Sequence, residues 1–352
     1  MSTAALLQVD GIHKHFDVGH GAVVRAVDGV SFSVGAGETL GLVGESGSGK
    51  STVAHSVLGL TKVDSGTIEF EGLDLTGLRR NELRGVRRSL TAVFKDPSGS
   101  LNRRRTVAAI VAAPLVAHGI GDRKARRARV LELLEHVGLG PEFLGRRPSE
   151  MSGGQCQRVA MARALATGPS LVVLDEAVSS LDVSIQAQVL NLLRKLQREN
   201  DLAYLFISHD LAVVRFLCTQ VAVMYRGRIV ETGPREIVFS RPLHPYTHSL
   251  MRAIPLVDPV RAREQISVTP ARDAIDMPTV EVGCRFRTLC PVGRDQEICR
   301  TVDPELKPIE RDHAAACHFP QVDEAAVVAA GSIPASLPGS DDAGDNRLVP
   351  DV

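Results

Sequence analysis

The chain has 352 residues, which is long enough for one large domain with a substantial core and a smaller second region. Its 41 basic and 41 acidic residues cancel, so no net field draws the protein toward nucleic acid or an anionic membrane. The N-terminus lacks the pattern of a signal peptide, and the longest apolar stretch, residues 107–116, is interrupted by Pro114 and too short to span a bilayer. We therefore expect a cytoplasmic protein without a transmembrane segment.

The first predicted elements are β-strands. Residues 7–9 and the alternating run 30–34 predict an antiparallel β lobe. Phe16 lies between them, shortly before a glycine-rich stretch, and its ring could stack on an adenine base. A place in the hydrophobic core fits this residue nearly as well.

Residues 44–51 fit the phosphate-loop pattern G-x-x-x-x-G-K-[ST]. An apolar run at 39–43 precedes them and helical spacing follows at 52–58, so the order is strand, glycine-rich turn and helix. The glycines let consecutive N–H groups surround an anion, and the helix N-terminus adds partial positive charge. Lys50 is expected to reach the β- and γ-phosphates, and the Ser51 hydroxyl to ligate Mg²⁺. The predicted nucleotide contacts are Gly44, Glu45, Ser46, Gly47, Ser48, Gly49, Lys50, Ser51 and Thr52.

The middle of the chain is predicted to be helical. Strands are predicted at 66–70 and 90–94, and residues 107–139 then show helical apolar spacing with no Pro- or Gly-rich linker. This pattern indicates a helical insertion, about residues 100–165, within one domain. Its last helix opens with a serine and two glycines, whose backbone N–H groups make a second candidate phosphate site. The residues at this start are Ser152, Gly153, Gly154 and Gln155.

Two later strands end in polar side chains. The apolar run 171–175 ends in Asp175 and is followed by Glu176. An acid at the end of a buried strand beside a phosphate loop is expected to coordinate Mg²⁺. The strand 203–208 is followed by His209, and a β-hairpin is predicted around Arg226 and Gly227.

Taken together, these stretches resemble the ATP-binding subunit of an ATP-binding-cassette (ABC) transporter. The Ser-Gly-Gly-Gln motif between a phosphate loop and a strand ending in Asp-Glu carries the resemblance. Residues 94–102, 183–191 and the His-Pro-Tyr-Thr stretch 244–247 are similar to the branch that energises dipeptide, oligopeptide and nickel import. The resemblance implies an α/β fold over residues 1–255, with a phosphate-loop (RecA-like) ABC ATPase core, an antiparallel β lobe and a helical insertion. It also implies ATP and Mg²⁺ as cofactors.

The resemblance assigns roles to the polar residues. Asp175 would hold Mg²⁺ through water, Glu176 would polarise the attacking water, and His209 would sense the γ-phosphate. The signature residues 152–155 would reach the ATP bound by a facing subunit, and Asp182 would lie at the seam between the two subunits.

The same resemblance implies an assembly. The partners would be a second ABC ATPase subunit, identical or different, and two membrane-spanning permease subunits. An extracytoplasmic solute-binding protein would act indirectly, and no nucleic acid is expected. The chain would then lie at the cytoplasmic face of the cell membrane.

Three residues depart from the family pattern. Lys95 stands where the family usually has a glutamine that contacts the metal and the attacking water. An ammonium group has donors only, so it cannot ligate Mg²⁺, but it can pair with a phosphate oxygen. Lys95 therefore stays in the predicted ATP site, with turnover expected to be reduced. Ala177 replaces a usual proline and Cys156 a commonly basic residue, and smaller effects are expected from both.

Four of the six cysteines lie in the proline-punctuated region 256–320, which the resemblance indicates is a small, irregular C-terminal extension of the peptide-importer type. Their spacing lacks the close Cys-x-x-Cys pairs of structural zinc sites. Four thiolates are admissible ligands for a [4Fe-4S] cluster, and some ATPases that resemble this chain carry one; zinc and free thiols remain alternatives. The remaining two, Cys156 and Cys218, are interpreted as ordinary buried cysteines. The candidate cluster ligands are Cys284, Cys290, Cys299 and Cys317.

Residues 321–352 are rich in Ala, Gly, Ser, Pro and Asp and predict a disordered tail.

The leading functional hypothesis is an ATPase subunit that drives a membrane importer for peptides or a similar small solute. One alternative is a soluble ABC protein acting on nucleic acid or ribosomes, but such proteins usually carry two cassettes or a long coiled-coil insertion. Another is a redox protein with regulatory ATP, but the sequence has no flavin or nicotinamide fingerprint.

Overall fold

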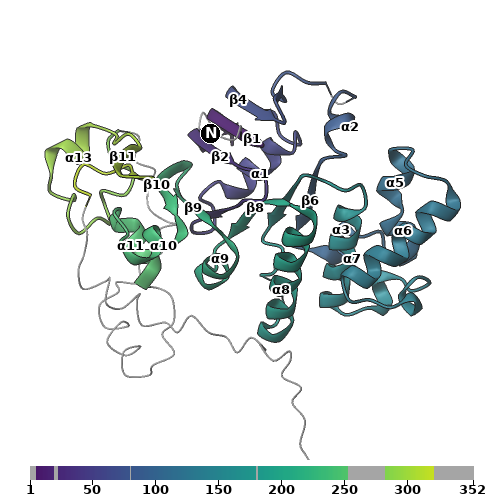
Figure 1. Cartoon of the computed structure of the whole chain (residues 1–352). Coiled ribbons are helices and arrows are strands. Elements are labelled where there is room, and N and C mark those ends of the chain that lie inside the picture. The colour runs from purple at the N-terminus through teal and green to yellow at the C-terminus, as the bar shows by residue number, and fades with distance from the viewer. Residues whose placement is uncertain (1–4, 20–22, 80, 180, 253–281, 321–352) are drawn as a thin grey trace, which may run out of the picture.

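Two β-sheets organise the molecule (Figure 1). The computed structural model describes residues 5–19, 23–79, 81–179, 181–252 and 282–320. The smaller sheet has four strands in the order β2-β1-β4-β5, and the larger has eight in the order β11-β12-β10-β9-β3-β8-β7-β6. The predicted disordered tail, 321–352, lies outside the described residues.

The smaller sheet is the predicted antiparallel lobe. Strand β1 pairs in antiparallel fashion with β2 on one side and with β4 on the other. Leu7 and Val9 are fully buried because alternate side chains of β1 face the core, and a register shift between Val9 and Ile12 brings Ile12 to the same face. The strands are β1 (Leu7–Asp17), β2 (Val23–Val34), β4 (Ser65–Phe70) and β5 (Leu73–Asp74).

The centre of the larger sheet is parallel and buried on both faces. Its strands therefore read as continuous apolar runs instead of alternating ones. Alternate side chains enter two separate cores. Leu42 and Leu205 pack with Val53 of the helix after the phosphate loop, while Phe206 and Leu174 pack under the helices of the opposite face. The elements are β3 (Thr39–Val43), α1 (Lys50–Val57), β6 (Leu90–Phe94), β7 (Leu171–Asp175), α8 (Val183–Asn200), β8 (Ala203–Ser208) and α9 (Leu211–Leu217).

The predicted helical insertion is present. Its helices pack around Leu133, Leu134 and Val159, which are almost completely buried in one cluster. Figure 1 shows this group at one end of the molecule, opposite the C-terminal region. Its elements, with the short helix that precedes them, are α2 (Leu83–Val86), α3 (Pro97–Ser100), α4 (Val107–Val111), α5 (Ala113–Ala117), α6 (Arg123–His136), two 3-10 turns (Pro141–Phe143 and Pro148–Glu150) and α7 (Gly153–Leu165).

The predicted hairpin closes the sheet on its other side. Strands β9 (Gln220–Tyr225) and β10 (Arg228–Pro234) pair in antiparallel fashion, and β9 runs parallel to β3. Helices α10 (Arg235–Ser240) and α11 (Pro245–Arg252) follow. None of the helices in the described ranges has the length and apolar character needed to cross a bilayer.

The C-terminal region is more closely joined to the core than an irregular appendage would be. It contains α13 (Glu297–Thr301), β11 (Lys307–Glu310) and β12 (His313–Ala315), and β12 pairs with β10. These strands are too short for a period-2 pattern to indicate them, and β11 contains a proline. The sequence interpretation therefore missed that this region extends the larger sheet.

A buried carboxylate fastens this junction. Glu231 of β10 is fully buried and accepts hydrogen bonds from the N–H groups of Leu243 and His244, each at 2.8 Å. Its Oε1 also lies 2.8 Å from Nε2 of His313 in β12. Because a buried charge needs such partners, this contact fixes the start of α11 and the last strand against β10.

Candidate functional site

The phosphate loop lies at the carboxyl end of β3 and can be built only with glycine at two positions. Gly44 has φ 153° and Gly49 has φ 104°. A Cβ on Gly44 would lie 2.1 Å from the carbonyl oxygen of Met224, and one on Gly49 would lie 2.0 Å from that of Ala26. Side chains are excluded there because the loop backbone touches both β9 and β2.

Lys50 curls back over this loop. Its ammonium donates hydrogen bonds to the carbonyl oxygens of Gly44 at 2.7 Å and Glu45 at 2.6 Å, and to Ser48 Oγ at 3.1 Å. Lys50 is 4% exposed, and burial lowers the pKa of its ammonium. A cation held this way beside backbone donors is suited to a polyphosphate, whose oxygens can replace the two carbonyls as acceptors.

Ser51 and Asp175 meet as the sequence predicted. Ser51 Oγ donates to Asp175 Oδ1 at 3.1 Å. Burial raises the pKa of the Asp175 carboxyl, although the Ser51 hydrogen bond opposes that shift. A hydroxyl and a carboxylate converging beside a phosphate loop form an oxygen donor set that fits Mg²⁺.

Glu176, the residue after Asp175, lies between two basic side chains, Lys95 and His209. It adopts a left-handed backbone conformation, φ 48°, which is uncommon for a residue with a side chain and is characteristic of functional sites. Its Oε2 accepts from Lys95 Nζ at 2.5 Å, and its Oε1 lies 3.4 Å from His209 Nδ1. Burial acts to raise the pKa of this carboxyl, but Lys95 and His209 outweigh burial and the pKa is lowered.

The predicted signature residues lie at the exposed start of α7. Ser152 Oγ accepts from the Gln155 N–H at 3.3 Å, and Gln155 Oε1 accepts from the Ser152 N–H at 3.0 Å. These two hydrogen bonds form a capping box, and Gly153 is exposed at the N-terminus of α7. A Cβ on Gly154 would lie 2.6 Å from Ile185 of α8, so the starts of the two helices touch.

Asp182 lies beside this signature. Its Oδ1 accepts from the Ile185 N–H at 3.0 Å and from Ser184 Oγ at 2.7 Å, which makes Asp182 the N-cap of α8.

Phe16 is 40% exposed on β1, and Lys14 Nζ lies 5.4 Å from the centroid of its ring. The alternative interpretation of Phe16 as a residue of the hydrophobic core is therefore excluded.

All six cysteines are free thiols in the structure, and five of them are buried. Cys156 and Cys218 are 1% and 0% exposed within the apolar core. Three of the other four are buried as well, and all four lie in the described part of the C-terminal region. Gly293 and Phe319 donate their N–H groups to the sulfurs of Cys290 at 3.1 Å and Cys317 at 3.4 Å.

One residue beside the phosphate loop was not predicted as a site residue. Tyr246 Oη accepts the Glu45 N–H at 3.0 Å, although the two residues are 201 positions apart. The sequence signal for this contact is the His-Pro-Tyr-Thr stretch 244–247, which by itself indicates only a resemblance to the importer branch.

Comparison with known proteins identifies two matching families. The family described as ABC transporter matches residues 27–179, and that described as oligopeptide/dipeptide transporter, C-terminal region, matches residues 230–299. A probable peptide ABC transporter ATP-binding protein of Sinorhizobium fredii is 49% identical over 321 residues, 89% of this chain and 90% of the relative. The oligopeptide transport ATP-binding protein AppF of Bacillus subtilis is 44% identical, covering 89% of this chain and 97% of that protein.

Solved structures agree with the fold. A dimeric ATP-binding cassette in a post-hydrolysis state, bound to ADP and Pi, superposes with a TM-score of 0.60 at 29% identity, covering 65% of this chain and 98% of that one. A cbiO protein of Clostridium perfringens, part of the ABC transporter complex cbiONQ, superposes with a TM-score of 0.60 at 27% identity, covering 67% of this chain and 90% of that one.

The first prediction concerns the phosphate loop. Lys50→Ala removes the ammonium that lies over the loop, so the dissociation constant for ATP should rise about 10- to 100-fold, the range for a charged hydrogen-bonding group. Isothermal titration calorimetry measures it, with Lys62→Ala as the control because Lys62 is exposed. An unchanged affinity in the Lys50 variant would contradict nucleotide binding at this loop.

Proposed function

The chain belongs to the ABC transporter family as an ATP-binding subunit, and on this premise we propose that it energises the import of peptides, or of a similar small solute, through a membrane partner. The observation that carries the proposal is the C-terminal match over residues 230–299, added to a cassette whose relatives are described as peptide and oligopeptide transport proteins. The chain covers 90% or more of the length of those relatives.

The nucleotide would bind through the phosphate loop. The loop amides and Lys50 would hold the phosphates, while Ser51 and Asp175 would hold Mg²⁺, Asp175 through water. Mg²⁺ supplies positive charge that offsets charge developing on the phosphate oxygens. Phe16 is exposed on β1 of the antiparallel lobe and would offer its ring to the adenine.

Glu176 would act as the base in hydrolysis. Its lowered pKa keeps the carboxylate charged, so it can accept a proton from an attacking water that it also orients. His209 contacts the other carboxylate oxygen and would report the γ-phosphate to the rest of the site.

The site would be completed by a facing subunit. Ser152 and the N–H groups that follow it lie at an exposed helix start, where a helix attracts anions. Asp182, beside them at the start of α8, would then lie at the seam between two ATPase subunits. Each composite site would need the loop of one subunit and the signature of the other, so nucleotide binding would drive closure.

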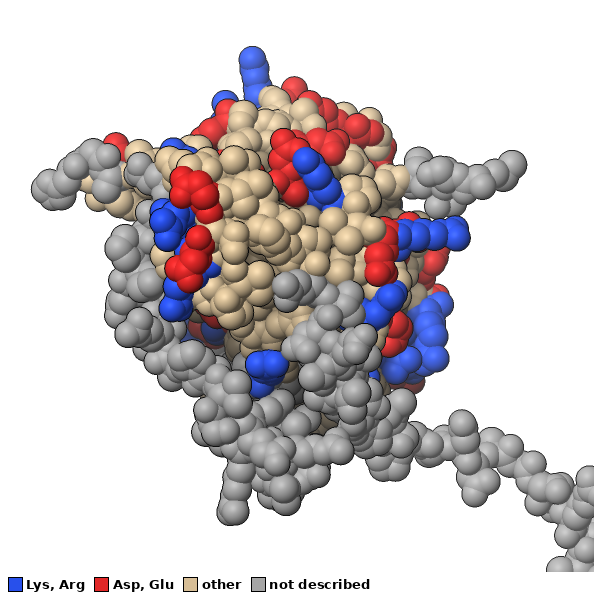
Figure 2. Space-filling view, turned by 90° about the vertical axis from the view of Figure 1, so that its left-hand side faces the viewer, with Lys and Arg blue, Asp and Glu red and all other residues tan. Residues whose placement is uncertain are grey.

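The remaining partners follow from this assembly. Two permease subunits would receive the motion of closure, and a solute-binding protein outside the membrane would deliver the solute. The chain would lie on the cytoplasmic face of the membrane. Figure 2 shows acidic and basic side chains interspersed on the face at the C-terminal region, and the descriptions of the relatives lend no support to the nucleic-acid alternative.

Purification from membranes tests this proposed function. Tagged protein extracted in mild detergent should be recovered with two membrane-spanning subunits, and its ATPase activity should rise when the complex is supplied with peptide. Recovery with nucleic acid or ribosomes in place of membrane subunits would contradict the proposal.

Lys95 would restrain turnover. Its ammonium neutralises the carboxylate that must orient water, and it cannot ligate the metal as an amide oxygen does. The pair must open before Glu176 can act on water, so this subunit would bind nucleotide well and hydrolyse it slowly.

Lys95→Gln should therefore raise kcat by about twofold to fivefold, the effect of releasing a partly exposed ion pair. Since Lys95 lowers the pKa of Glu176, the acid-side fall in rate should move to higher pH in the variant. A steady-state pH profile measures both effects, with Lys195→Gln on the exposed face of α8 as the control. A slower variant would show that Lys95 assists the reaction, and an unmoved acid limb would show that Lys95 does not set the titration that limits the rate.

The four C-terminal cysteines would hold a [4Fe-4S] cluster. Within the described residues, no three of their sulfurs lie within 4.8 Å of one another, whereas a zinc ion at about 2.3 Å from each sulfur would need a tighter group. Backbone N–H groups already reach three of the sulfurs, those of Cys284, Cys290 and Cys317, and such bonds stabilise cluster thiolates. Burial raises the pKa of the Cys284 thiol to about 12, so a metal would have to displace its proton.

Metal analysis checks this assignment. Protein purified anaerobically should contain about four iron atoms and about four acid-labile sulfides per chain, as four thiolate ligands of one cubane cluster require. The Cys290→Ser variant should lose most of both, while Cys218→Ser, outside the group, should retain them. About one zinc per chain, or rapid alkylation of all four thiols in the folded protein, would overturn the cluster.

A further inference from the structure

The His-Pro-Tyr-Thr stretch lies against the phosphate loop. Tyr246 is 1% exposed, and its hydroxyl accepts the backbone N–H of Glu45 at 3.0 Å. The carbonyl oxygen of Gly44, which belongs to the same peptide group as this N–H, accepts Lys50 Nζ at 2.7 Å. Tyr246 therefore fixes the peptide group that sets where the lysine rests.

The ring of Tyr246 is held by other aromatic rings. Its centroid lies 4.5 Å from that of Tyr225 and 5.6 Å from that of Phe286, and Phe286 lies 5.7 Å from the ring of His244. Phe286 is 5% exposed and comes from the C-terminal cysteine region, which we define as residues 282–320. Phe286, a side chain of the cysteine region, therefore packs against Tyr246, the residue that contacts the phosphate loop.

A second connection runs through the neighbouring residue. Arg285 donates to the carbonyl oxygen of Arg226 and to the Asp28 carboxylate. The N–H of Gly227, in the same turn, donates to the Ser48 carbonyl at 2.9 Å. Arg285 is therefore connected to Ser48 of the phosphate loop through the Arg226–Gly227 turn, and Phe286 is connected to Glu45 through Tyr246.

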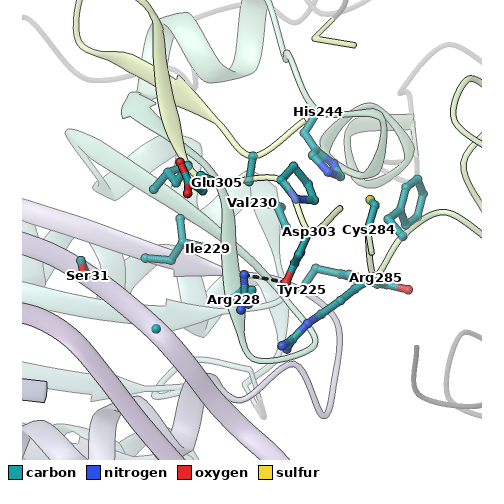
Figure 3. Close-up of a pocket in the computed structure, with 15 residues that line it drawn as sticks. Ser31, Tyr225, Arg228, Ile229, Val230, His244, Cys284, Arg285, Asp303 and Glu305 are labelled. Atoms are coloured by element: carbon teal, nitrogen blue, oxygen red, sulfur yellow. Dashed lines mark ion pairs between the residues drawn. The ribbon is translucent and has the colours of Figure 1, made fainter. Parts of the chain in front are cut away.

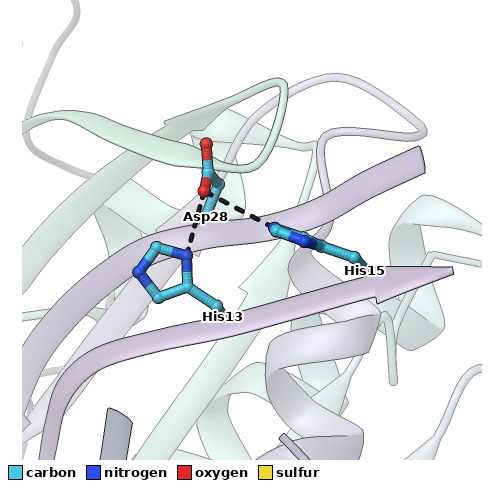
Figure 4. A group of neighbouring side chains, drawn as sticks. All are labelled: His13, His15 and Asp28. Carbon is cyan, nitrogen blue, oxygen red and sulfur yellow. Dashed lines mark hydrogen bonds and ion pairs between the residues drawn. The ribbon is translucent and has the colours of Figure 1, made fainter. Parts of the chain in front are cut away.

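Asp28 anchors this second connection. Burial acts to raise the pKa of its carboxyl, but Arg285 and Arg228, with His13, lower it to about 2. Figure 4 shows His13 and His15 facing one oxygen of this carboxylate. The other oxygen is bound by the two guanidinium groups, whose charge would repel a metal ion, so the group serves as an ionic anchor.

The contacts between the cysteine region and the loop are concentrated in a few side chains. A cavity of about 220 Å³ lies between β10 and the cysteine region, lined by Arg228, Ile229, Asp303 and Leu306 among others (Figure 3). An ion pair of 2.7 Å between Arg228 and Asp303 crosses it. Arg285 and Phe286 line this cavity as well, and they contact Arg226, in the turn that bonds the loop, and Tyr246, which bonds the loop directly.

We propose that Tyr246 is a positioning residue for the phosphate loop, and that Arg285 and Phe286 make nucleotide affinity depend on the folded cysteine region. The physical basis is preorganisation: a loop whose backbone is already held loses less conformational freedom when it binds phosphates. The inference rests on the proposed nucleotide binding at this loop.

Two neighbouring tyrosines give a matched test. Tyr246→Phe removes only the hydroxyl that holds Glu45, and the dissociation constants for ATP and ADP should rise about threefold to tenfold, the range for one lost hydrogen bond. Tyr225→Phe removes an equally buried hydroxyl that has no hydrogen-bond partner among the described residues, so affinity should be unchanged. Calorimetric titration measures both, and thermal unfolding without nucleotide shows whether the two variants are equally folded.

A second variant tests the link to the cysteine region. Phe286→Leu keeps the Tyr246 hydroxyl but removes the ring behind it, so it should weaken nucleotide binding in the same direction. Combined with Tyr246→Phe, it should add little, because both changes release the same loop contact. Fully additive losses would overturn transmission through Phe286.

Lys50→Ala separates failure of this inference from failure of the proposed function. If Tyr246→Phe binds nucleotide like Tyr225→Phe while Lys50→Ala loses affinity, the nucleotide site stands and Tyr246 has no positioning role. If Lys50→Ala also binds normally, nucleotide binding at the loop is itself wrong and the inference falls with it.

Discussion

The close approach of the phosphate-loop backbone to two strands is the constraint on which the rest of the molecule depends. Gly44 lies against the carbonyl of Met224 and Gly49 against that of Ala26, with no room for a Cβ at either place. The loop is therefore where three parts of the chain meet: the antiparallel lobe, the β9–β10 hairpin and, through Tyr246, helix α11. Any change that moves one of these parts also acts on the nucleotide site.

The two carboxylates at the end of β7 are tuned in opposite directions by their surroundings. Burial dominates at Asp175 and raises its pKa, while Lys95 and His209 dominate at Glu176 and lower its pKa. Opposite shifts in neighbouring carboxyl groups fit the division of roles that we propose for them, metal binding and water orientation. Lys95 lies on the same sheet edge, because β6 and β7 are parallel neighbours and Phe94 is in register with Asp175. The residue that departs from the family pattern thus contacts the carboxylate that we propose as the base in hydrolysis.

The sequence predicted the parts of the site that are local in the chain. The phosphate loop, the acids after a buried strand and the capped signature helix each have a pattern within about ten residues, and each was found where it was expected. The Lys95–Glu176 pair joins residues 81 positions apart, and the Tyr246–Glu45 contact joins residues 201 positions apart, so neither had a local signal. The strands β11 and β12 were missed for another reason: β12 pairs with β10 and contacts the buried Glu231, and β11 pairs with β12, so tertiary contacts stabilise them more than their own sequence does.

The central claim is that nucleotide phosphates take the place of the carbonyl groups around Lys50, and one structure tests it most directly. A crystal structure of the full chain with Mg²⁺ and a non-hydrolysable ATP analogue should show Lys50 Nζ on the β- and γ-phosphates, with Mg²⁺ between Ser51 and the Asp175 carboxylate. The Glu45 N–H should still be bonded to Tyr246. A nucleotide bound elsewhere, or Lys50 still on the carbonyls of Gly44 and Glu45 with the analogue in place, would contradict the account.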